Sequence, residues 1–565
     1  ASSHPTTMST SSSQSPYVPA HPDESVKARV EALFHGEVPE SAALPELNCN
    51  RYLLNGELVE WSGKSQVVES PLCLVDAATG QLVRRRLGTI HCLEKDAAME
   101  LLENAYQAFD NGRGAWPRAT PEYRIECVTK FIAEMAKLRE TIVRLLMHEI
   151  GKARKESEAE FDRTIKYIQE TAAAVRARNN NDSRILTASG HAAQVRRSPL
   201  GVALVLGPAN YPLNETLVIL LPALIMGNCC VAKLPRAGAL ALATLFPALQ
   251  SSFPPGAVNA FFGRGVETVG PIIQSGKLSA MAFIGGSSAA NMLRVQHPKP
   301  SRMRCVLGLD AKNAAIVMPD ADLDTTIKEL LLGTLGFSGQ RCTAIKITFV
   351  HRSIVDRVLE RLAAAVDAIG FGLPWSADDV AVSPLYEYSR VQSMQAYVDD
   401  AIAHGASVVN RNGGLTNGSF YYPSVVYPVK PTMRLWTEEQ FGPVVPIVPF
   451  DDVSEVIDYV ADSKYGQQVS VFGFDPVAVG SLIDILVNIV CRVNLNGACK
   501  RGPDEFPFTA RKDSAEGTLD IESAIRAFSI RTMVAAPITT PNRMLIQHII
   551  TQRTSQFLNN VRHSQ

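Results

Sequence analysis

The chain lacks an excess of charge of either sign. Its 565 residues include 55 lysines and arginines and 56 aspartates and glutamates, giving a formal net charge of −1. Nucleic acids and anionic membrane surfaces attract proteins largely through clustered positive charge. The composition therefore gives no electrostatic reason to expect a nucleic-acid or a membrane partner.

A long hydrophobic run is also missing. The most apolar stretch, residues 217–232, is interrupted by Pro222, Gly227 and Asn228 and is shorter than the roughly 20 residues that span a bilayer as a helix. It predicts instead a helix that leads into a buried strand. With 46% hydrophobic and 20% charged residues, the chain has the composition of a globular protein large enough for several domains.

The ten cysteines lack the spacing of metal ligands, and two of them, Cys229 and Cys230, are adjacent. Structural zinc sites place cysteines in closely spaced pairs with intervening residues. In a chain of this size, cysteines without such spacing indicate reduced thiols in a reducing compartment. We therefore expect no metal site and a cytoplasmic location.

Acidic residues are missing from residues 1–22, which are rich in serine, threonine and proline. Such a composition does not favour a packed structure. An organellar transit segment would also contain arginines, which are absent here. We rank a plain flexible tail, covering residues 1–48, above organellar targeting, which stays open.

What the chain does contain is an alternation of strand-like and helical segments. Helical periodicity covers residues 94–109 and 123–155, and Asn55-Gly56 predicts a hairpin turn. Apolar runs that predict a first series of strands are residues 202–206, 229–233, 258–262, 281–284 and 314–317. A second series, between residues 320 and 501, has strands at residues 347–350, 469–474 and 492–496. This order predicts an α/β fold with two doubly wound parallel sheets.

The segment of residues 337–347 carries most of the chemical information. Cys342 follows a Gly-Gln-Arg turn and precedes a strand-like run. The neighbouring Arg341 and backbone N–H groups outside regular structure both favour the thiolate, the nucleophilic form of cysteine. A free cysteine is more often a buried structural thiol, so this segment alone does not establish a nucleophile.

Residues 338–344, Ser-Gly-Gln-Arg-Cys-Thr-Ala, resemble the catalytic-cysteine motif of the aldehyde dehydrogenase superfamily, and most of all its NADP-dependent non-phosphorylating glyceraldehyde-3-phosphate dehydrogenases. The resemblance runs from about Asn55 to about Val534, with several motifs in family order. It implies a Rossmann-like cofactor domain, a catalytic domain and a small β oligomerisation element, and hence a homo-oligomer, either a dimer or a tetramer. These parts correspond to residues 49–182 with 198–308, residues 309–502, and residues 183–197 with 526–538. Residues 542–565 form a C-terminal extension past the family's end.

The resemblance implies an NADP site. Lys233 matches the lysine that approaches the adenosine ribose, and Arg236 stands where an acid would select NAD. Arg236 could pair with a 2′-phosphate, or be a solvated surface arginine. The other matches, to residues around the pyrophosphate and the nicotinamide ribose and ring, are Gly263, Gly270, Gly285, Gly286, Glu439 and Phe441. Ile284 and Gly286 replace a Thr and a Ser of the family, which leaves backbone N–H groups at a helix start to bind the pyrophosphate.

The same resemblance assigns catalytic roles to Cys342 and Asn210. Cys342 attacks an aldehyde to form a thiohemiacetal, and Asn210 with the Cys342 backbone N–H stabilises the oxyanion. Hydride loss gives a thioester, which water hydrolyses to a carboxylic acid. Without the cysteine motif, Asn210 would be interpreted as a turn residue.

At the position of the base that would hydrolyse the thioester, the sequence departs from the family pattern. The family's Glu-Leu-Gly-Gly-Lys corresponds to Gly-Leu-Asp-Ala-Lys at residues 308–312, so Gly308 replaces the glutamate. Two acids could substitute: Asp310, which strand alternation places on the face of Gly308, and Glu215, just over one helical turn beyond Asn210. We prefer Glu215 for its reach, although either could be an ordinary surface or capping acid.

Four residues match the phosphate-binding positions of the glyceraldehyde-3-phosphate enzymes: Arg163, Tyr211, Arg341 and Arg501. Three guanidiniums suit a dianionic phosphate better than a carboxylate. The expected function is the NADP-dependent, irreversible oxidation of glyceraldehyde 3-phosphate to 3-phosphoglycerate. Two alternatives remain: a dehydrogenase for another phosphorylated or anionic aldehyde, and a catalytically weak binding protein on the same fold, suggested by Gly308.

Overall fold

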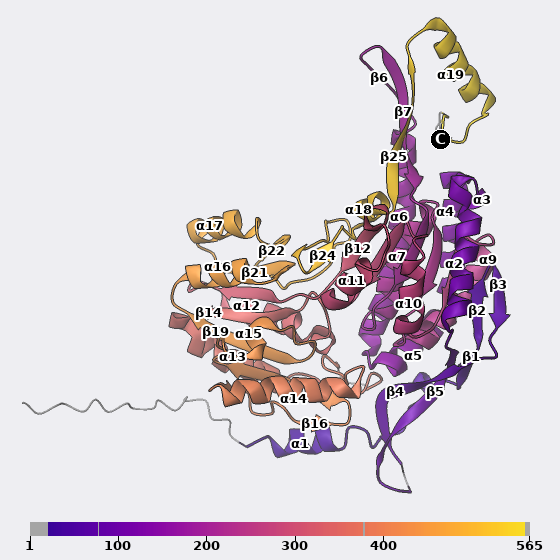
Figure 1. The fold of residues 1–565 in the computed structure, drawn as a ribbon. Helices are drawn as coiled ribbons and strands as arrows, with labels where there is room; N and C mark the ends of the chain where they lie inside the picture. Colours follow the sequence, from indigo (N-terminus) through magenta and orange to yellow (C-terminus); the bar gives the residue numbers. More distant parts are fainter. Residues whose placement is uncertain (1–20, 77, 377–378, 560–565) are drawn as a thin grey trace, which may run out of the picture.

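The computed structural model describes residues 21–76, 78–376 and 379–559, and in this part of the chain two large sheets form the body of the molecule (Figure 1). The first sheet has the strand order β24-β12-β11-β8-β9-β10-β2-β3, and its five strands from β12 to β10 are parallel. The five are β8 (Val202–Leu206), β9 (Cys229–Lys233), β10 (Val258–Phe261), β11 (Ala280–Ile284) and β12 (Arg304–Gly308). The short antiparallel strands β24 (Ala515–Glu516), β2 (Arg51–Leu54) and β3 (Glu57–Glu60) complete its edges.

The strand order of the first sheet creates a switch point. The chain leaves β8 towards β9 and β10 on one side and later returns to place β11 and β12 on the other. The loops after β8 and β11 therefore diverge at the carboxyl edge of the sheet, where doubly wound proteins bind their ligands.

Helices of the first domain pack around this sheet. They are α2 (Lys95–Phe109), α3 (Ala115–Arg118), α4 (Pro121–Ala136), α5 (Arg139–Ile150), α6 (Arg154–Asn181), α7 (Pro212–Ile225), α8 (Ala239–Ala243), α9 (Phe246–Ser252), α10 (Gly265–Gln274) and α11 (Ser287–Arg294). Pro212 occupies the first turn of α7, where its missing N–H costs no helical hydrogen bond. Within Pro212–Ile225, every residue except Glu215 is buried, as expected of a helix that is apolar on all sides.

The second sheet has the order β15-β18-β19-β14-β13-β21-β22 and is parallel apart from β15. Along β13, Ala314 and Ile316 join one hydrophobic cluster while Ala315 and Val317 join another, so both faces of the sheet are buried. Its strands are β13 (Asn313–Val317), β14 (Ile345–His351), β15 (Ser407–Val408), β18 (Ser424–Tyr427), β19 (Val444–Phe450), β21 (Gln468–Phe472) and β22 (Arg492–Leu495). The accompanying helices are α12 (Leu323–Leu335), α13 (Val355–Asp367), α14 (Tyr388–Ala403), α15 (Arg434–Thr437), α16 (Val453–Asp462) and α17 (Pro476–Leu486).

Most predicted strands are found within two residues of their expected ends, and residues 202–206 and 229–233 match β8 and β9. The predicted hairpin turn is also present, because Asn55 and Gly56 adopt positive φ angles of 52° and 76° between β2 and β3. The run at residues 314–317 was grouped with the first series of strands, although the predicted catalytic domain, residues 309–502, includes it; it is part of β13, which pairs with β14 and β21 in the second sheet. Position along the sequence does not fix the sheet that a strand joins.

The flexible tail predicted over residues 1–48 is wrong for its second half. Asp23 caps the helix α1 (Glu24–Glu31), and Val30 and Phe34 are buried against aromatic residues of the second domain. Strand β1 (Leu47–Cys49) then pairs with β5 (Leu82–His91), which also pairs with β4 (Ser65–Val75). A few well-placed apolar residues order this segment although its average composition is polar. Residues 1–20 of the predicted tail lie outside the described residues.

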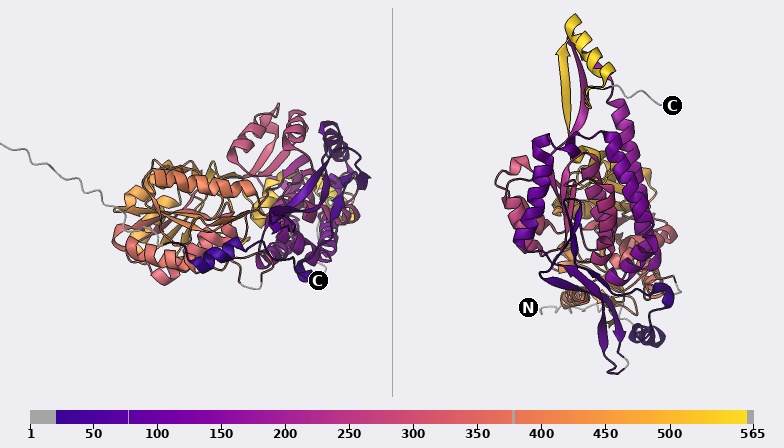
Figure 2. Two further views of the ribbon diagram at one scale, coloured as in Figure 1. Left: turned by 90° about the horizontal axis from the view of Figure 1, so that it is seen from below. Right: turned by 90° about the vertical axis from the view of Figure 1, so that its right-hand side faces the viewer.

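A third, smaller sheet projects from the body as an arm (Figures 1 and 2). It consists of β6 (Ile185–Ala188), β7 (His191–Pro199) and β25 (Ser529–Pro537), all antiparallel. These strands coincide with the two pieces that the sequence analysis assigned to neither large sheet. The predicted C-terminal extension contributes the helix α19 (Thr540–Gln552), after which Asn559 returns to bond Arg196 on β7.

Within residues 21–76, 78–376 and 379–559, no helix combines the length and hydrophobicity needed to cross a membrane. The same residues hold no cluster of three or more His, Cys, Asp or Glu side chains suited to a metal ion.

Candidate active site

A cavity of about 640 Å³ opens at the carboxyl edge of the first sheet, at its switch point. The loops that follow β8, β9, β11 and β12 form one side of it. Segments of the second domain around Cys342, Glu439 and Arg501 form the other side. The cavity therefore lies where the two domains meet.

This cavity brings together most of the site residues predicted from the sequence. Gly263 and Gly270 are not among its lining residues, because Gly263 lies beyond the end of β10 and Gly270 lies inside α10. The predicted residues that line it are Arg163, Asn210, Tyr211, Glu215, Lys233, Arg236, Gly285, Gly286, Arg341, Cys342, Glu439, Phe441 and Arg501.

Cys342 lies between a tight turn (Gly336–Gly339) and β14, with its side chain half-buried. Its backbone carbonyl accepts a hydrogen bond of 2.9 Å from the amide of Asn313 on β13, which fixes the turn against the second sheet. Burial raises the pKa of the Cys342 thiol to about 11, and the negative charges of Glu215 and Glu439 act in the same direction. The thiol is therefore protonated at neutral pH.

The expectation that Arg341 stabilises the thiolate is wrong. Its guanidinium donates to the carbonyl oxygens of Leu332 and Gly333 at 2.7 and 3.0 Å, near the end of α12. Carbonyls at a helix C-terminus carry partial negative charge and attract a cation. The Arg341 side chain is thus held by α12, although it still lines the cavity.

Asn210 is held beside the cysteine turn. Its amide nitrogen donates to the backbone carbonyl of Gln340 at 2.8 Å, two residues before Cys342. An amide nitrogen carries two N–H groups, so one remains for a ligand. The Asn210 backbone carbonyl accepts a bond of 3.0 Å from the buried Lys152, which is also paired with Glu160.

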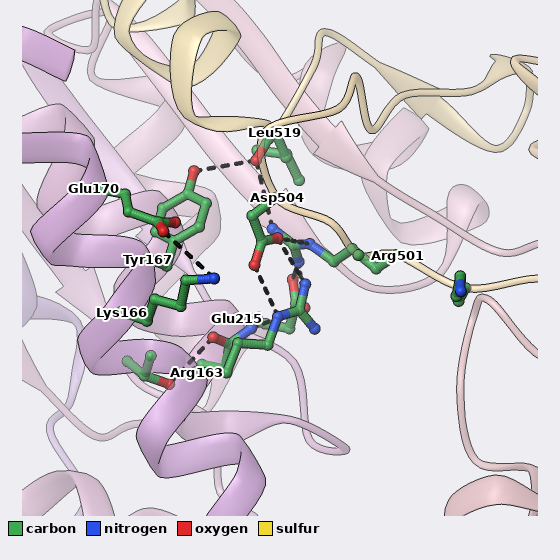
Figure 3. A network of polar contacts seen from close by, with 12 residues as sticks. Arg163, Lys166, Tyr167, Glu170, Glu215, Arg501, Asp504 and Leu519 are labelled. Atoms are coloured by element: carbon green, nitrogen blue, oxygen red, sulfur yellow. Dashed lines mark hydrogen bonds and ion pairs between the residues drawn. The ribbon is translucent and has the colours of Figure 1, made fainter.

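A network of four charged residues occupies the end of the cavity near α6 (Figure 3). Arg163 makes a bidentate ion pair with Asp504, in which two guanidinium nitrogens lie 2.9 and 2.7 Å from the two carboxylate oxygens. Arg501 bonds both carboxylate oxygens of Glu215, and its Nε lies 3.7 Å from Asp504. Burial opposes the charge of Arg501, but Glu215 and Asp504 outweigh it and raise the pKa of the guanidinium. Two of the predicted phosphate-binding arginines are thus matched by two carboxylates.

The remaining predicted phosphate ligand, Tyr211, is enclosed by other side chains. Its ring meets that of Phe337 edge-on, with centroids 5.6 Å apart, and Lys152 Nζ lies 3.6 Å from the Tyr211 ring centroid. Burial raises the pKa of the Tyr211 hydroxyl, so it stays protonated and can donate a hydrogen bond.

The two candidate bases differ in their surroundings. Glu215 and Gly308 line, with Cys342, a small extension of the cavity, and Glu215 is the charged group that most raises the thiol pKa. Asp310 instead accepts hydrogen bonds from the backbone N–H and hydroxyl of Ser287, at 2.8 and 2.9 Å. The strand-alternation argument for Asp310 was wrong, because β12 ends at Gly308 and Asp310 lies in the following loop.

The same cavity holds the predicted cofactor residues Lys233, Arg236 and Glu439. Lys233 ends β9, and burial lowers the pKa of its ammonium group. Arg236 is exposed and forms an ion pair of 2.9 Å with Glu387. Glu439 accepts a bond of 3.2 Å from the Ala311 N–H and lies 3.5 Å from Lys346.

Several residues that hold these groups in place were not predicted from the sequence: Lys152, Glu160, Lys346, Arg390 and Asp504. Arg390 stacks near Phe441, with its guanidinium carbon 5.6 Å from the ring centroid. One had a local signal, because Asp504 follows Arg501 by three residues and lies 3.7 Å from its Nε. The other four have no local signal.

Comparisons with known proteins fit this geometry. The model of the aldehyde dehydrogenase family matches residues 77–534. The NADP-dependent glyceraldehyde-3-phosphate dehydrogenase of Streptococcus equinus is 30% identical over 83% of this chain and 96% of its own length. Lactaldehyde dehydrogenase of Escherichia coli (strain K12) is 28% identical over 74% of this chain and 85% of its own length.

A solved structure is similar over almost the same range. The NADP-dependent glyceraldehyde-3-phosphate dehydrogenase from Bacillus halodurans C-125, complexed with NADP, has a TM-score of 0.78 and 28% identity, covering 87% of this chain and 100% of that one. This similarity confirms the α/β fold class expected from the sequence.

Proposed function

The chain belongs to the aldehyde dehydrogenase family, and from this premise we propose that it oxidises glyceraldehyde 3-phosphate to 3-phosphoglycerate with NADP. The observation that carries the oxidation is the placement of Cys342 beside the Asn210 amide in a cavity shared by both domains. The phosphorylated substrate and the choice of NADP are supported by the names of the relatives and by the arginines that line the cavity.

The proposed reaction begins at Cys342. Its thiol proton passes to water, its sulfur forms a bond to the aldehyde carbon, and the C=O π electrons move to the oxygen, which becomes an oxyanion. The free N–H of the Asn210 amide and the Cys342 backbone N–H stabilise this charge. Loss of hydride leaves a thioester, and water then releases the acid and restores the thiol. NADP, when bound, supplies the hydride acceptor.

The residues that line the cavity fit NADP. Lys233 and Arg236 would face the adenosine ribose and its 2′-phosphate. Lys346 and the Ala311 N–H hold the Glu439 carboxylate in position to bind a ribose hydroxyl, and Lys346 also lies near the ring of Phe441. Asp310 does not suit the cofactor, because it adds a carboxylate to the wall of the same cavity.

Replacing Arg236 with glutamate should narrow or invert a preference for NADP over NAD. Loss of a charge-assisted contact and gain of a repulsive charge should reduce kcat/KM for NADP by about ten- to a hundredfold, with little loss for NAD. Steady-state rates with both cofactors measure the ratio. Glu387→Gln is the matched control, because it removes the partner of Arg236 and should favour NADP. If the wild type prefers NAD and Arg236→Glu shows the same preference, Arg236 does not determine the choice of cofactor.

The phosphate site should discriminate by charge. Arg341→Ala or Arg501→Ala should raise KM for glyceraldehyde 3-phosphate about ten- to a hundredfold more than KM for unphosphorylated glyceraldehyde, since a charge-assisted contact contributes ~1.5–3 kcal/mol. Initial rates with the two aldehydes provide the comparison. Equal losses on both would assign these arginines to the fold or to catalysis.

A second candidate function is oxidation of an unphosphorylated aldehyde. The observation in its favour is that Arg163 and Arg501 are already neutralised by Asp504 and Glu215, so a phosphate must displace carboxylates to bind. The lactaldehyde dehydrogenase relative fits this alternative.

One assay separates the candidates. NADPH formation is measured at steady state with glyceraldehyde 3-phosphate, glyceraldehyde and lactaldehyde, without inorganic phosphate. The proposal expects the highest kcat/KM with the phosphorylated substrate. Higher values with lactaldehyde would favour the second candidate, and no NADPH with any aldehyde would favour a binding protein without turnover.

We also propose that the arm mediates homo-oligomer formation in the cytoplasm. Its strands expose the apolar side chains of Leu186, Ile530 and Met533 to solvent, which is unfavourable for an isolated chain. All ten cysteines are free, in keeping with a reducing compartment.

A further inference from the structure

The start of α11 already holds an anion that belongs to the chain itself. The Asp310 carboxylate accepts the backbone N–H of Ser287 at 2.8 Å and the Ser287 hydroxyl at 2.9 Å. Gly285, Gly286 and Asp310 all line the cavity that also contains Lys233 and Cys342. A helix N-terminus favours negative charge because its first N–H groups are unpaired. Asp310 therefore uses the helix end that a phosphate would otherwise occupy.

The loop that carries Asp310 is firmly anchored. Before it, the Leu309 N–H donates to the Ser514 carbonyl at 2.9 Å. After it, the Ala311 N–H bonds Glu439 and the Lys312 ammonium group bonds the Gln440 side chain at 2.6 Å. Because both flanks are held, the carboxylate cannot leave the cavity by a simple swing of the backbone.

The two nearest lysines do not pair with Asp310. Lys312 donates to the backbone carbonyl of Glu438 and to the Gln440 side chain, and Lys346 donates to the Gln440 carbonyl and pairs with Glu439. The Asp310 charge also contributes to the raised pKa of Glu439, after the larger effect of burial and against that of Lys346. Asp310 therefore adds a carboxylate to the cavity wall that these lysines do not neutralise.

We infer that Asp310 determines the affinity of the dinucleotide site, because its carboxylate competes with the cofactor's pyrophosphate for the N-terminus of α11. This inference rests on the proposed use of NADP. A dinucleotide that spans the cavity from Lys233 to Cys342 must carry its two phosphates past Gly285 and Gly286. There it meets a fixed like charge, which opposes binding, and loses the Ser287 N–H as a partner. The wild-type chain should consequently bind dinucleotides weakly, and the pyrophosphate should contribute little to affinity.

The test is a binding measurement on two variants, Asp310→Asn and Asp310→Gly. The asparagine keeps an oxygen that can accept the Ser287 N–H and removes only the charge, while glycine also frees the N–H. Calorimetric titration with NADP should give a Kd at least about tenfold lower for Asp310→Asn than for wild type, and lower still for Asp310→Gly. Thermal unfolding of each variant checks that the fold is intact, and either variant suffices if the other unfolds.

The ligand series identifies the phosphate concerned. The Asp310 variants should bind NADP and 2′-phospho-ADP-ribose, which contain the pyrophosphate, more tightly than the wild type does. Their affinity for adenosine 2′-phosphate, which lacks the pyrophosphate, should not increase. Glu387→Gln is the matched control: it removes one negative charge beside Arg236 and should change the affinities of all three ligands alike.

Three outcomes would overturn the inference. Unchanged or weaker NADP binding in both folded variants would show that Asp310 does not compete with the cofactor. If the wild type still binds NADP in that case, NADP remains the proposed cofactor. An equal gain with adenosine 2′-phosphate would indicate a general charge effect. If no protein in the series binds NADP, both the inference and the proposed cofactor fail.

Discussion

Replacing Cys342 with serine is expected to abolish the aldehyde-dependent formation of NADPH while leaving the binding of NADP nearly unchanged. A serine hydroxyl is a far weaker nucleophile than a thiolate, and removal of a catalytic nucleophile commonly costs a factor of roughly 10³ to 10⁶ in rate. The serine is close in size to cysteine, so the turn before β14 and its bond from Asn313 should persist. Absorbance at steady state and in the first turnover measures the loss. Substantial NADPH production by the purified variant would remove Cys342 from its catalytic role.

The pH dependence of the Cys342 reaction follows from the raised thiol pKa. With a pKa of about 11, the thiolate fraction rises about tenfold per pH unit up to that value. Alkylation of Cys342 in the unliganded protein should therefore be slow at pH 7 and accelerate through pH 10. The Cys342→Ser variant gives the background from the other nine cysteines. Fast, pH-independent alkylation near pH 7 would contradict the protonated state.

The elements that form the edge of the cavity could be predicted because they are buried parallel strands. Such strands appear in a sequence as continuous apolar runs, and in β8 and β9 these runs end at Gly207 and Leu234-Pro235. The loops at their carboxyl ends meet at the switch point, so motifs in these loops converge on one cavity. Asn210 and Lys233 were assigned by resemblance to the family's motifs rather than from the strand pattern, and both line the cavity.

Side-chain partners across the domains could not be predicted in the same way. Arg163 and Asp504 are 341 positions apart, and Glu215 and Arg501 are 286 positions apart. Their pairing depends on how α6, α7 and the segment after β22 pack, which no local pattern encodes. The same limit applies to Arg341: adjacency to Cys342 in sequence suggested a shared charge, but its side chain turns towards α12. Sequence identified the groups of the site, and packing decided which of their charges remain free.

The second large effect is expected at Glu215, the proposed base for thioester hydrolysis. Its carboxylate lines the cavity with Cys342 and Gly308, and its charge acts on the thiol. A carboxylate there can take a proton from the attacking water, and such general-base help contributes about a hundred- to ten-thousandfold. Glu215→Gln should therefore preserve a first-turnover burst of NADPH, one per active site, and slow the following steady state by about that factor. Rapid-mixing absorbance measurements resolve the two phases.

The structure also defines the controls for Glu215→Gln. Glutamine removes the charge that pairs with Arg501, but Asp504 remains 3.7 Å from the Arg501 Nε, so the guanidinium keeps one carboxylate. Loss of the Glu215 charge should also lower the pKa of the Cys342 thiol, which would leave the burst as fast as in wild type or faster. Asp310→Asn, measured at saturating NADP, should change steady-state turnover little, because the wild-type Asp310 carboxylate is held by Ser287. If Asp310→Asn stalls turnover and Glu215→Gln does not, the base lies after β12. If neither variant shows a slower steady state, hydrolysis proceeds without either carboxylate.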